Sequence, residues 1–190
     1  MTTSTLHIKN MVCDRCIMVV ENELQNLGYV VEQISLGKAV VQGILETAAK
    51  DKIDEQLQKL GFVLIEDKKQ RWVEQVKNLI IEMVHHQDDA FIKFNLSEYL
   101  SNELHLDYSY ISSFFSEIEN TTIEKYFISQ KTERIKELIS YNELTLSEIA
   151  FKMHYSSIAH LSNQFKKVTG LSPTQYKHQL AQSRKAIDKI

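Results

Sequence analysis

The sequence predicts an α+β protein with an N-terminal βαββαβ domain followed by an all-α domain of about seven helices. Two observations carry this prediction. Strand-like alternation and helical periodicity follow one another in residues 1–66, whereas from Gln70 onward apolar residues recur only at helical spacing. With 190 residues, of which 43% are apolar, the chain is long enough for one or two packed domains.

The first domain is expected to contain six elements. β-Branched, alternating runs predict the strands, and apolar residues at helical spacing that end at Gly28 or Gly61 predict two glycine-capped helices. In chain order we expect strand Thr5–Lys9, helix Cys16–Leu27, strand Tyr29–Ile34, strand Ala39–Val41, helix Ala48–Leu60 and strand Phe62–Ile65. The middle strands are joined by a short turn at Leu36-Gly37-Lys38. This order is that of the split βαβ, or ferredoxin-like, arrangement.

Both cysteines, Cys13 and Cys16, fall in the loop between the first strand and the first helix. Two thiolates at this spacing can bind one ion, and a helix N-terminus lowers their pKa. Two soft ligands favour Cu(I), with Hg(II) as an alternative, whereas Zn(II) normally takes four ligands and no second Cys/His pair is suitably spaced. A redox pair and two thiols that merely pack are the other interpretations.

The cysteine loop resembles that of a known family. The run Asn10-Met11-Val12-Cys13-Asp14-Arg15-Cys16 and the later Gly61-Phe62 are similar to motifs of heavy-metal-associated domains, over about 65 residues. The resemblance implies a metal site at Cys13 and Cys16. Val12 stands where zinc-exporting members tend to carry Asp, which favours copper, and Asn10 stands where the family usually has Gly. Met11 is expected to be a core residue beneath the loop.

The helical part contains one unit twice. Phe115-x4-Asn120-x5-Tyr126 and Phe165-x4-Gly170-x5-Tyr176 each follow a histidine, His105 or His154, by about ten residues. Each unit predicts helix, tight turn and helix. This is the helix-turn-helix outline, whose second helix enters the DNA major groove.

The second unit is the better defined. Thr145 or Ser147 can cap a helix that continues through Ile149–Met153, and Ser157–Val168 forms the next helix. Residues 140–190 contain seven Lys or Arg and three Asp or Glu, although the whole chain carries a net charge of −3. A basic C-terminal third is typical of a DNA-binding surface.

These units resemble the DNA-binding domain of AraC-type transcription regulators. The matching residues of the second unit are Ile149-Ala150, Phe165-Lys166, Gly170, Ser172-Pro173 and Tyr176. The upstream copy, Leu96–Phe127, resembles that family's first unit. The resemblance covers about residues 70–182 and implies a seven-helix domain, followed by a tail at 183–190. His105 and His154 replace the family's usual Gly and are expected to adopt positive φ, as is Asn120 at a helix end.

By analogy, the second helix of each unit carries the candidate DNA-binding residues. They are Ser109, Ser112, Ser113, Ser156, Ser157, His160, Asn163, Gln164, Lys166 and Lys167. Short polar groups can contact base edges, and lysines attract phosphate. In the first unit Glu117 and Glu119 follow the candidate serines, and carboxylates beside a phosphate backbone weaken binding. We therefore expect the second unit to supply most of the affinity.

The sequence thus predicts a transcription regulator that binds double-stranded DNA and senses Cu(I), or less favourably Hg(II) or Zn(II), at Cys13 and Cys16. Alternatives are a copper-trafficking protein with a helical partner module, an AraC-type regulator with a degenerate N-terminal domain, and a thiol oxidoreductase. No catalytic motif is present, so an enzyme is not expected.

Location and assembly are further expectations. No apolar run approaches the roughly 20 residues of a membrane helix, and the N-terminus does not resemble a signal peptide, so a cytoplasmic protein is expected. The apolar stripe from Trp72 to Val84 spans about two heptads and is compatible with a homodimer. As the first helix of the DNA-binding domain it is expected to pack inward instead.

Overall fold

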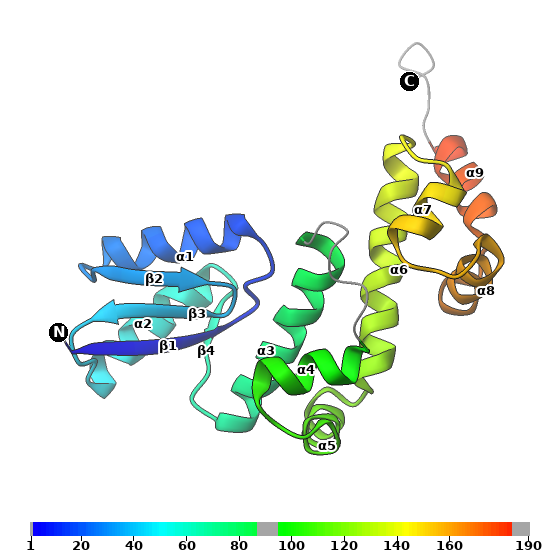
Figure 1. The fold of residues 1–190 in the computed structure, drawn as a ribbon. Helices are drawn as coiled ribbons and strands as arrows, with labels where there is room; N and C mark the ends of the chain where they lie inside the picture. The colour runs from blue at the N-terminus through cyan, green and yellow to red at the C-terminus, as the bar shows by residue number, and fades with distance from the viewer. Residues whose placement is uncertain (1, 87–94, 184–190) are drawn as a thin grey trace, which may run out of the picture. The chain divides into compact units, whose positions relative to one another are not determined.

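The computed structural model describes residues 2–86 and 95–183 and contains a four-stranded sheet and a series of helices (Figure 1). The chain forms two compact units. The first unit combines Met1–Ile81 with Leu96–Asn120, and the second combines Glu82–Asn95 with Thr121–Ile190. None of the helices within the described residues is both long and apolar enough to cross a membrane.

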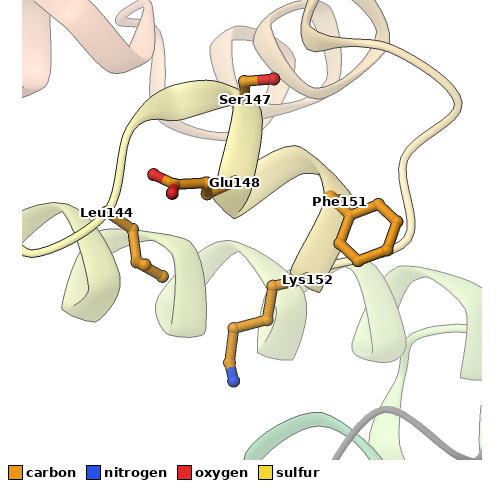
Figure 2. A pocket seen from close by; sticks show the side chains of 5 residues that line it. All are labelled: Leu144, Ser147, Glu148, Phe151 and Lys152. Atoms are coloured by element: carbon orange, nitrogen blue, oxygen red, sulfur yellow. The ribbon is translucent and has the colours of Figure 1, made fainter.

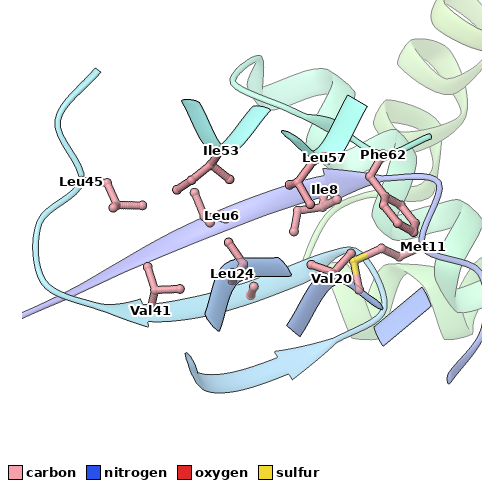
Figure 3. Close-up of a cluster of buried hydrophobic side chains, with 11 residues drawn as sticks. Leu6, Ile8, Met11, Val20, Leu24, Val41, Leu45, Ile53, Leu57 and Phe62 are labelled. Atoms are coloured by element: carbon pink, nitrogen blue, oxygen red, sulfur yellow. The ribbon is translucent and has the colours of Figure 1, made fainter. Parts of the chain in front are cut away.

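The first unit contains an antiparallel sheet with the strand order β2-β3-β1-β4. The strands are β1 (Thr3–Lys9), β2 (Val31–Ser35), β3 (Lys38–Gln42) and β4 (Val63–Leu64), with α1 (Asp14–Asn26) after β1 and α2 (Thr47–Lys59) after β3. Side chains from both helices meet those of β1 and β3 in one core (Figure 3). The six predicted elements are all present, in the predicted order.

Glycine caps end α1 and α2, as the sequence predicts. Gly61 has φ +86°, its N–H donates to the carbonyl of Gln58, and the N–H of Phe62 donates to the carbonyl of Leu57. This is a Schellman motif, and the buried Phe62 and Leu57 supply its apolar contact. The same pattern at the end of α1 engages the N–H of Tyr29. Tyr29 therefore belongs to the helix cap, and β2 begins two residues later than predicted.

The first unit also contains three helices: α3 (Lys68–Ile81), α4 (Leu96–Leu104) and α5 (Tyr108–Glu119). The Trp72 ring of α3 lies 5.8 Å from that of Tyr110 and 5.5 Å from that of Phe114, both on α5. The ion pair between Lys69 and Glu117, at 3.4 Å, also joins these helices. The predicted boundary between residues 66 and 70 thus lies inside this compact unit.

The hairpin turn between β2 and β3 lies against α3. Gly37 has φ +77°, and a Cβ at this position would overlap the side-chain amide of Asn78 on α3. Gly28 has φ +89° but nothing within 4 Å of its Cβ position. Both Gly→Ala changes incur left-handed strain of ~1–2 kcal/mol. We expect Gly37→Ala to lower the free energy of unfolding more than Gly28→Ala, as measured by urea denaturation.

A double variant separates the two contributions to the loss of stability, the overlap with Asn78 and the left-handed backbone strain. The variant with both Gly37→Ala and Asn78→Ala should regain the free energy of unfolding that the overlap with Asn78 costs. The loss caused by backbone strain at residue 37 should remain. Equal losses for Gly37→Ala and Gly28→Ala would contradict the expected difference and would show that the Asn78 amide moves aside at little cost.

In its described residues, the second unit contains η1, a π-helical turn (Glu82–His86), and four α-helices: α6 (Ile123–Tyr141), α7 (Leu146–Lys152), α8 (Ile158–Thr169) and α9 (Pro173–Ser183). The predicted stripe from Trp72 to Val84 is therefore not one continuous α-helix. α3 ends at Ile81, and the chain continues as η1, in which the His85 ring is hydrogen-bonded to Gln130 of α6 at 3.1 Å. Of the predicted tail, residues 184–190 lie outside the described part.

Candidate functional site

The two cysteine thiols lie together at the start of α1. Cys13 is the N-cap residue, and the two sulfur atoms are 3.5 Å apart, half-buried and not disulfide-bonded. The backbone N–H of Cys16, the largest cause, lowers the pKa of the Cys13 thiol below its ordinary value, and the charge of Arg15 acts in the same direction. The arrangement presents two polarisable sulfur ligands, one of which is more readily ionised than a free thiol.

Met11 and Asn10 fix the loop that carries the thiols to the rest of the first unit. Met11 is completely buried and packs beside Phe62 in the core, as predicted (Figure 3). Asn10 has φ +73° and donates from Nδ2 to the carbonyl oxygen of Gly61 at 2.9 Å. Asn10 therefore adopts the left-handed conformation that favours glycine and ties the loop to the end of α2.

In the first helix-turn-helix unit, the turn between α4 and α5 contains His105 at φ +52°, and Asn120 ends α5 at φ +52°. Both left-handed conformations are as predicted. Ser109 and Ser113 are exposed. Ser112 is half-buried, and its hydroxyl donates to the carbonyl of Ser109 at 3.2 Å.

The acidic residues of α5 have partners that the sequence did not reveal. Glu117 lies 3.4 Å from the Lys69 ammonium, and Glu119 lies 3.5 Å from that of Lys77. Both lysines belong to α3, more than 40 residues away in the sequence. Because each carboxylate is paired, its repulsion of a phosphate backbone is weaker than the sequence alone implies.

The second unit has a complete local cap. Thr145 accepts from the Glu148 N–H, and the Glu148 side chain accepts from the Thr145 N–H, so Thr145 rather than Ser147 is the N-cap. His154 has φ +54° in the turn, as predicted. Ser157 caps α8, because its hydroxyl accepts from the His160 N–H at 3.1 Å. Ser157 thus has a structural role in addition to any contact with DNA.

The expected DNA-binding residues of the second unit lie in or just before the first turns of α8 and along that helix. Ser156, Ser157, His160, Asn163, Lys166 and Lys167 are exposed, whereas Gln164 is half-buried. The Ser156 hydroxyl lies 3.1 Å from Nδ1 of His160. This surface combines hydrogen-bonding groups with two positive charges, the chemistry needed for base edges and phosphates.

Tyr155, in the turn between α7 and α8, organises this surface. Its hydroxyl donates to Oε1 of Gln164, and its ring lies edge-on to His160 at 5.2 Å. Lys131 of α6 places its ammonium 4.0 Å from the centre of the Tyr155 ring. Burial raises the pKa of Tyr155 to about 12 and lowers that of Lys131 to about 8. Tyr155 therefore remains a hydrogen-bond donor throughout the neutral pH range.

A shallow hollow of about 470 Å³ lies along α7 (Figure 2). It is lined by Leu144, Ser147, Glu148, Phe151 and Lys152. The Phe151 side chain is 77% exposed. None of the expected DNA-binding residues lines this hollow.

Residues 100–179 match the family model described as a helix-turn-helix domain. The match begins within α4 and ends within α9. YtdP of Bacillus subtilis (strain 168), an uncharacterized HTH-type transcriptional regulator, is 27% identical over 108 residues, or 55% of this chain and 14% of YtdP. The Msm operon regulatory protein of Streptococcus mutans serotype c (strain ATCC 700610 / UA159) is 26% identical over 109 residues, or 57% of this chain and 37% of that protein.

A solved structure shows the same helical fold. The C-terminal domain of AraT, a response regulator from Geobacillus stearothermophilus, has a TM-score of 0.50 and 22% sequence identity, and the match covers 60% of this chain and 88% of that one. This likeness concerns the fold alone. The chain spans less than two-fifths of the length of the curated relatives above.

Proposed function

We propose that this protein is an AraC-type transcription regulator that binds double-stranded DNA through its two helix-turn-helix units. The match of residues 100–179 to a helix-turn-helix domain carries the proposal. The names of the similar proteins, two of which are regulators of transcription or of an operon, support it.

We assign most of the affinity to α8. His160 and Asn163 are exposed on this helix, and Lys166 and Lys167 follow at its end. An amide can donate and accept at an adenine edge, and an ammonium can replace a counterion at a phosphate. Gln164 is already hydrogen-bonded to Tyr155, so its role is to hold α8 in position as much as to contact a base.

Binding measurements with lysine variants test this assignment. Duplexes are first selected from a random-sequence pool by the wild-type protein, and affinity is then measured by fluorescence anisotropy over a range of salt concentrations. Lys166→Ala with Lys167→Ala should weaken binding to all selected duplexes, and the slope of log K against log salt should become shallower by roughly 2.

The matched control removes the same charge elsewhere. Lys52→Ala with Lys59→Ala changes two exposed lysines of α2. This control should leave both the affinity and the slope unchanged. Equal weakening by both pairs, or no sequence-selective binding by the wild type, would contradict the proposal.

We further propose that Cys13 and Cys16 form a sensor site for Cu(I), with Hg(II) and Zn(II) less favoured. The 3.5 Å separation of the two sulfurs supports this, because it is less than twice a typical metal–sulfur distance of about 2.3 Å. In the described part of the chain no group of three or more His, Cys, Asp and Glu side chains is positioned to hold a metal ion. Two thiols alone suit Cu(I) better than Zn(II). The strand order β2-β3-β1-β4 also supports a split βαβ domain of the kind that the loop resembles.

In this proposal, metal binding shifts the balance between DNA-competent and DNA-incompetent arrangements. α3 contacts the hairpin turn, where Asn78 lies beside Gly37, and it contacts α5 through the ion pair of Lys69 with Glu117. These contacts support a physical connection within the first unit.

Copper trafficking is the second candidate function. It differs in predicting transfer of Cu(I) to a partner protein with no effect of Cu(I) on DNA affinity.

A further inference from the structure

A small polar cavity lies beside the sheet of the first unit, between β1, the end of β4, α2 and the start of α3. Its volume is about 320 Å³, at the low end of the usual range for small-molecule sites. The polar side chains that line it are Thr5, His7, Lys50, Glu66 and Arg71. Neither the cysteine thiols nor the candidate DNA-binding residues belong to it.

The cavity has an excess of unpaired positive charge. Within the described residues, neither Lys50 nor Arg71 takes part in an ion pair. The Nε atom of Arg71 is buried without a hydrogen-bond partner. A buried donor in this condition is destabilising unless an acceptor reaches it, so each such group needs an explanation. Glu66, the only carboxylate among the lining residues, is exposed to solvent.

Nearby positive charge also affects the pKa of His7. Its pKa is lowered, first by burial and then by the charges of Arg71 and Lys38. A neutral imidazole beside two cations can donate one hydrogen bond without adding charge. The cavity therefore offers a forked guanidinium, an ammonium, an imidazole and the Thr5 hydroxyl to one ligand.

We propose that this cavity binds the phosphate group of a small molecule. A phosphate monoester has a charge of about −1.5 to −2 at neutral pH and three acceptor oxygens, which matches Lys50 and Arg71 better than a singly charged carboxylate does. The ligand is either free inorganic phosphate or a phosphomonoester. Because Arg71 lies on α3 between Lys69 and Trp72, which both contact α5, the site is on the helix that supports the first helix-turn-helix unit.

The experiment follows the Arg71 Nε–H signal of the full ¹⁵N-labelled chain by NMR. Inorganic phosphate and glycerol 3-phosphate are titrated separately at constant pH and ionic strength, with acetate as the carboxylate probe. We expect saturable shifts with a Kd on the order of 1 mM or tighter for at least one phosphate probe, and weaker binding of acetate. Saturation by both probes identifies the phosphate group itself as the ligand. Saturation by glycerol 3-phosphate alone identifies a phosphomonoester.

Variants establish which side chains are responsible for phosphate binding. Where Arg71 is changed, the backbone amide signals of the cavity residues serve as the readout. Arg71→Gln and Lys50→Gln should each weaken binding by about tenfold, whereas Lys52→Gln, an exposed neighbour on α2, should not. Glu66→Gln should tighten binding, a gain that a purely structural role would not produce. Thermal unfolding of each variant checks the fold. No saturable shift in the wild type, or wild-type affinity in both Arg71→Gln and Lys50→Gln, would overturn the proposal.

Discussion

The variant with both Cys13→Ser and Cys16→Ser is expected to lose tight Cu(I) binding while it keeps its fold. A serine hydroxyl is a hard, neutral ligand, so it does not replace a thiolate toward a soft ion. Both positions are half-buried, and the change leaves no large cavity. Cys13 is the N-cap of α1 and its side chain makes no cap hydrogen bond, and serine is a strongly preferred N-cap residue. The variant should therefore be at least as stable as the wild type.

The measurement is anaerobic competition with a chromophoric Cu(I) chelator, repeated with Zn(II). Tight binding by the wild type should fall by several orders of magnitude in the double variant, because both ligands are removed. Met18→Leu is the matched control, since Met18 is an exposed sulfur-bearing residue of the same helix and should contribute nothing. If the wild type binds neither ion, the thiols are a packing feature, and the DNA-binding proposal stands without a metal signal.

The same proteins test the connection to DNA. Cu(I) should change the affinity of the wild type for the selected duplexes and leave the cysteine variant unaffected. Equal affinity of the apo and Cu(I)-loaded wild type would rule out sensing through DNA affinity. Thiol-dependent transfer of Cu(I) to a second protein would then favour the trafficking function.

Phe165→Ala is expected to destabilise the second unit by ~3–5 kcal/mol, the usual range for a large aromatic residue in a core. Phe165 is 1% exposed on α8 and belongs to a core that also contains Ile135 of α6, Ile149 of α7 and Leu161 of α8 itself. Its ring lies 5.6 Å from that of Tyr176 on α9. Removal of the ring leaves a void beneath the helix that carries the candidate DNA-binding residues, so DNA affinity should fall together with stability.

Phe151→Ala is the control for this substitution. It makes the same chemical change on α7 of the same unit, but the Phe151 side chain is largely exposed, so we expect an effect within about 0.5 kcal/mol. Urea denaturation followed by circular dichroism gives the free energy of unfolding for both variants. Equal losses for the two variants would contradict the assignment of Phe165 to the core.

The sequence was most informative where structure depends on neighbours within a few residues. The βαββαβ order, the glycine ends of α1 and α2, and the left-handed conformations of His105, Asn120 and His154 are all present. Caps and turns are determined by hydrogen bonds and steric limits over three to five residues, so a single sequence contains the relevant information. The errors also have local causes, because the cap at Tyr29 shortens β2 and η1 interrupts the stripe after Ile81.

By itself, then, the sequence determined the α+β class, the thiol pair at a helix N-terminus and the repeated helix-turn-helix units. Only the tertiary structure decided how distant residues act on them. The hydrogen bond from Asn10 to Gly61 and the ion pairs of the α5 carboxylates with Lys69 and Lys77 join groups far apart in the chain. The packing around the cavity also leaves the Nε atom of Arg71 buried without a hydrogen-bond partner. Such contacts depend on how whole elements pack and on which polar groups lose their water, and neither follows from local pattern.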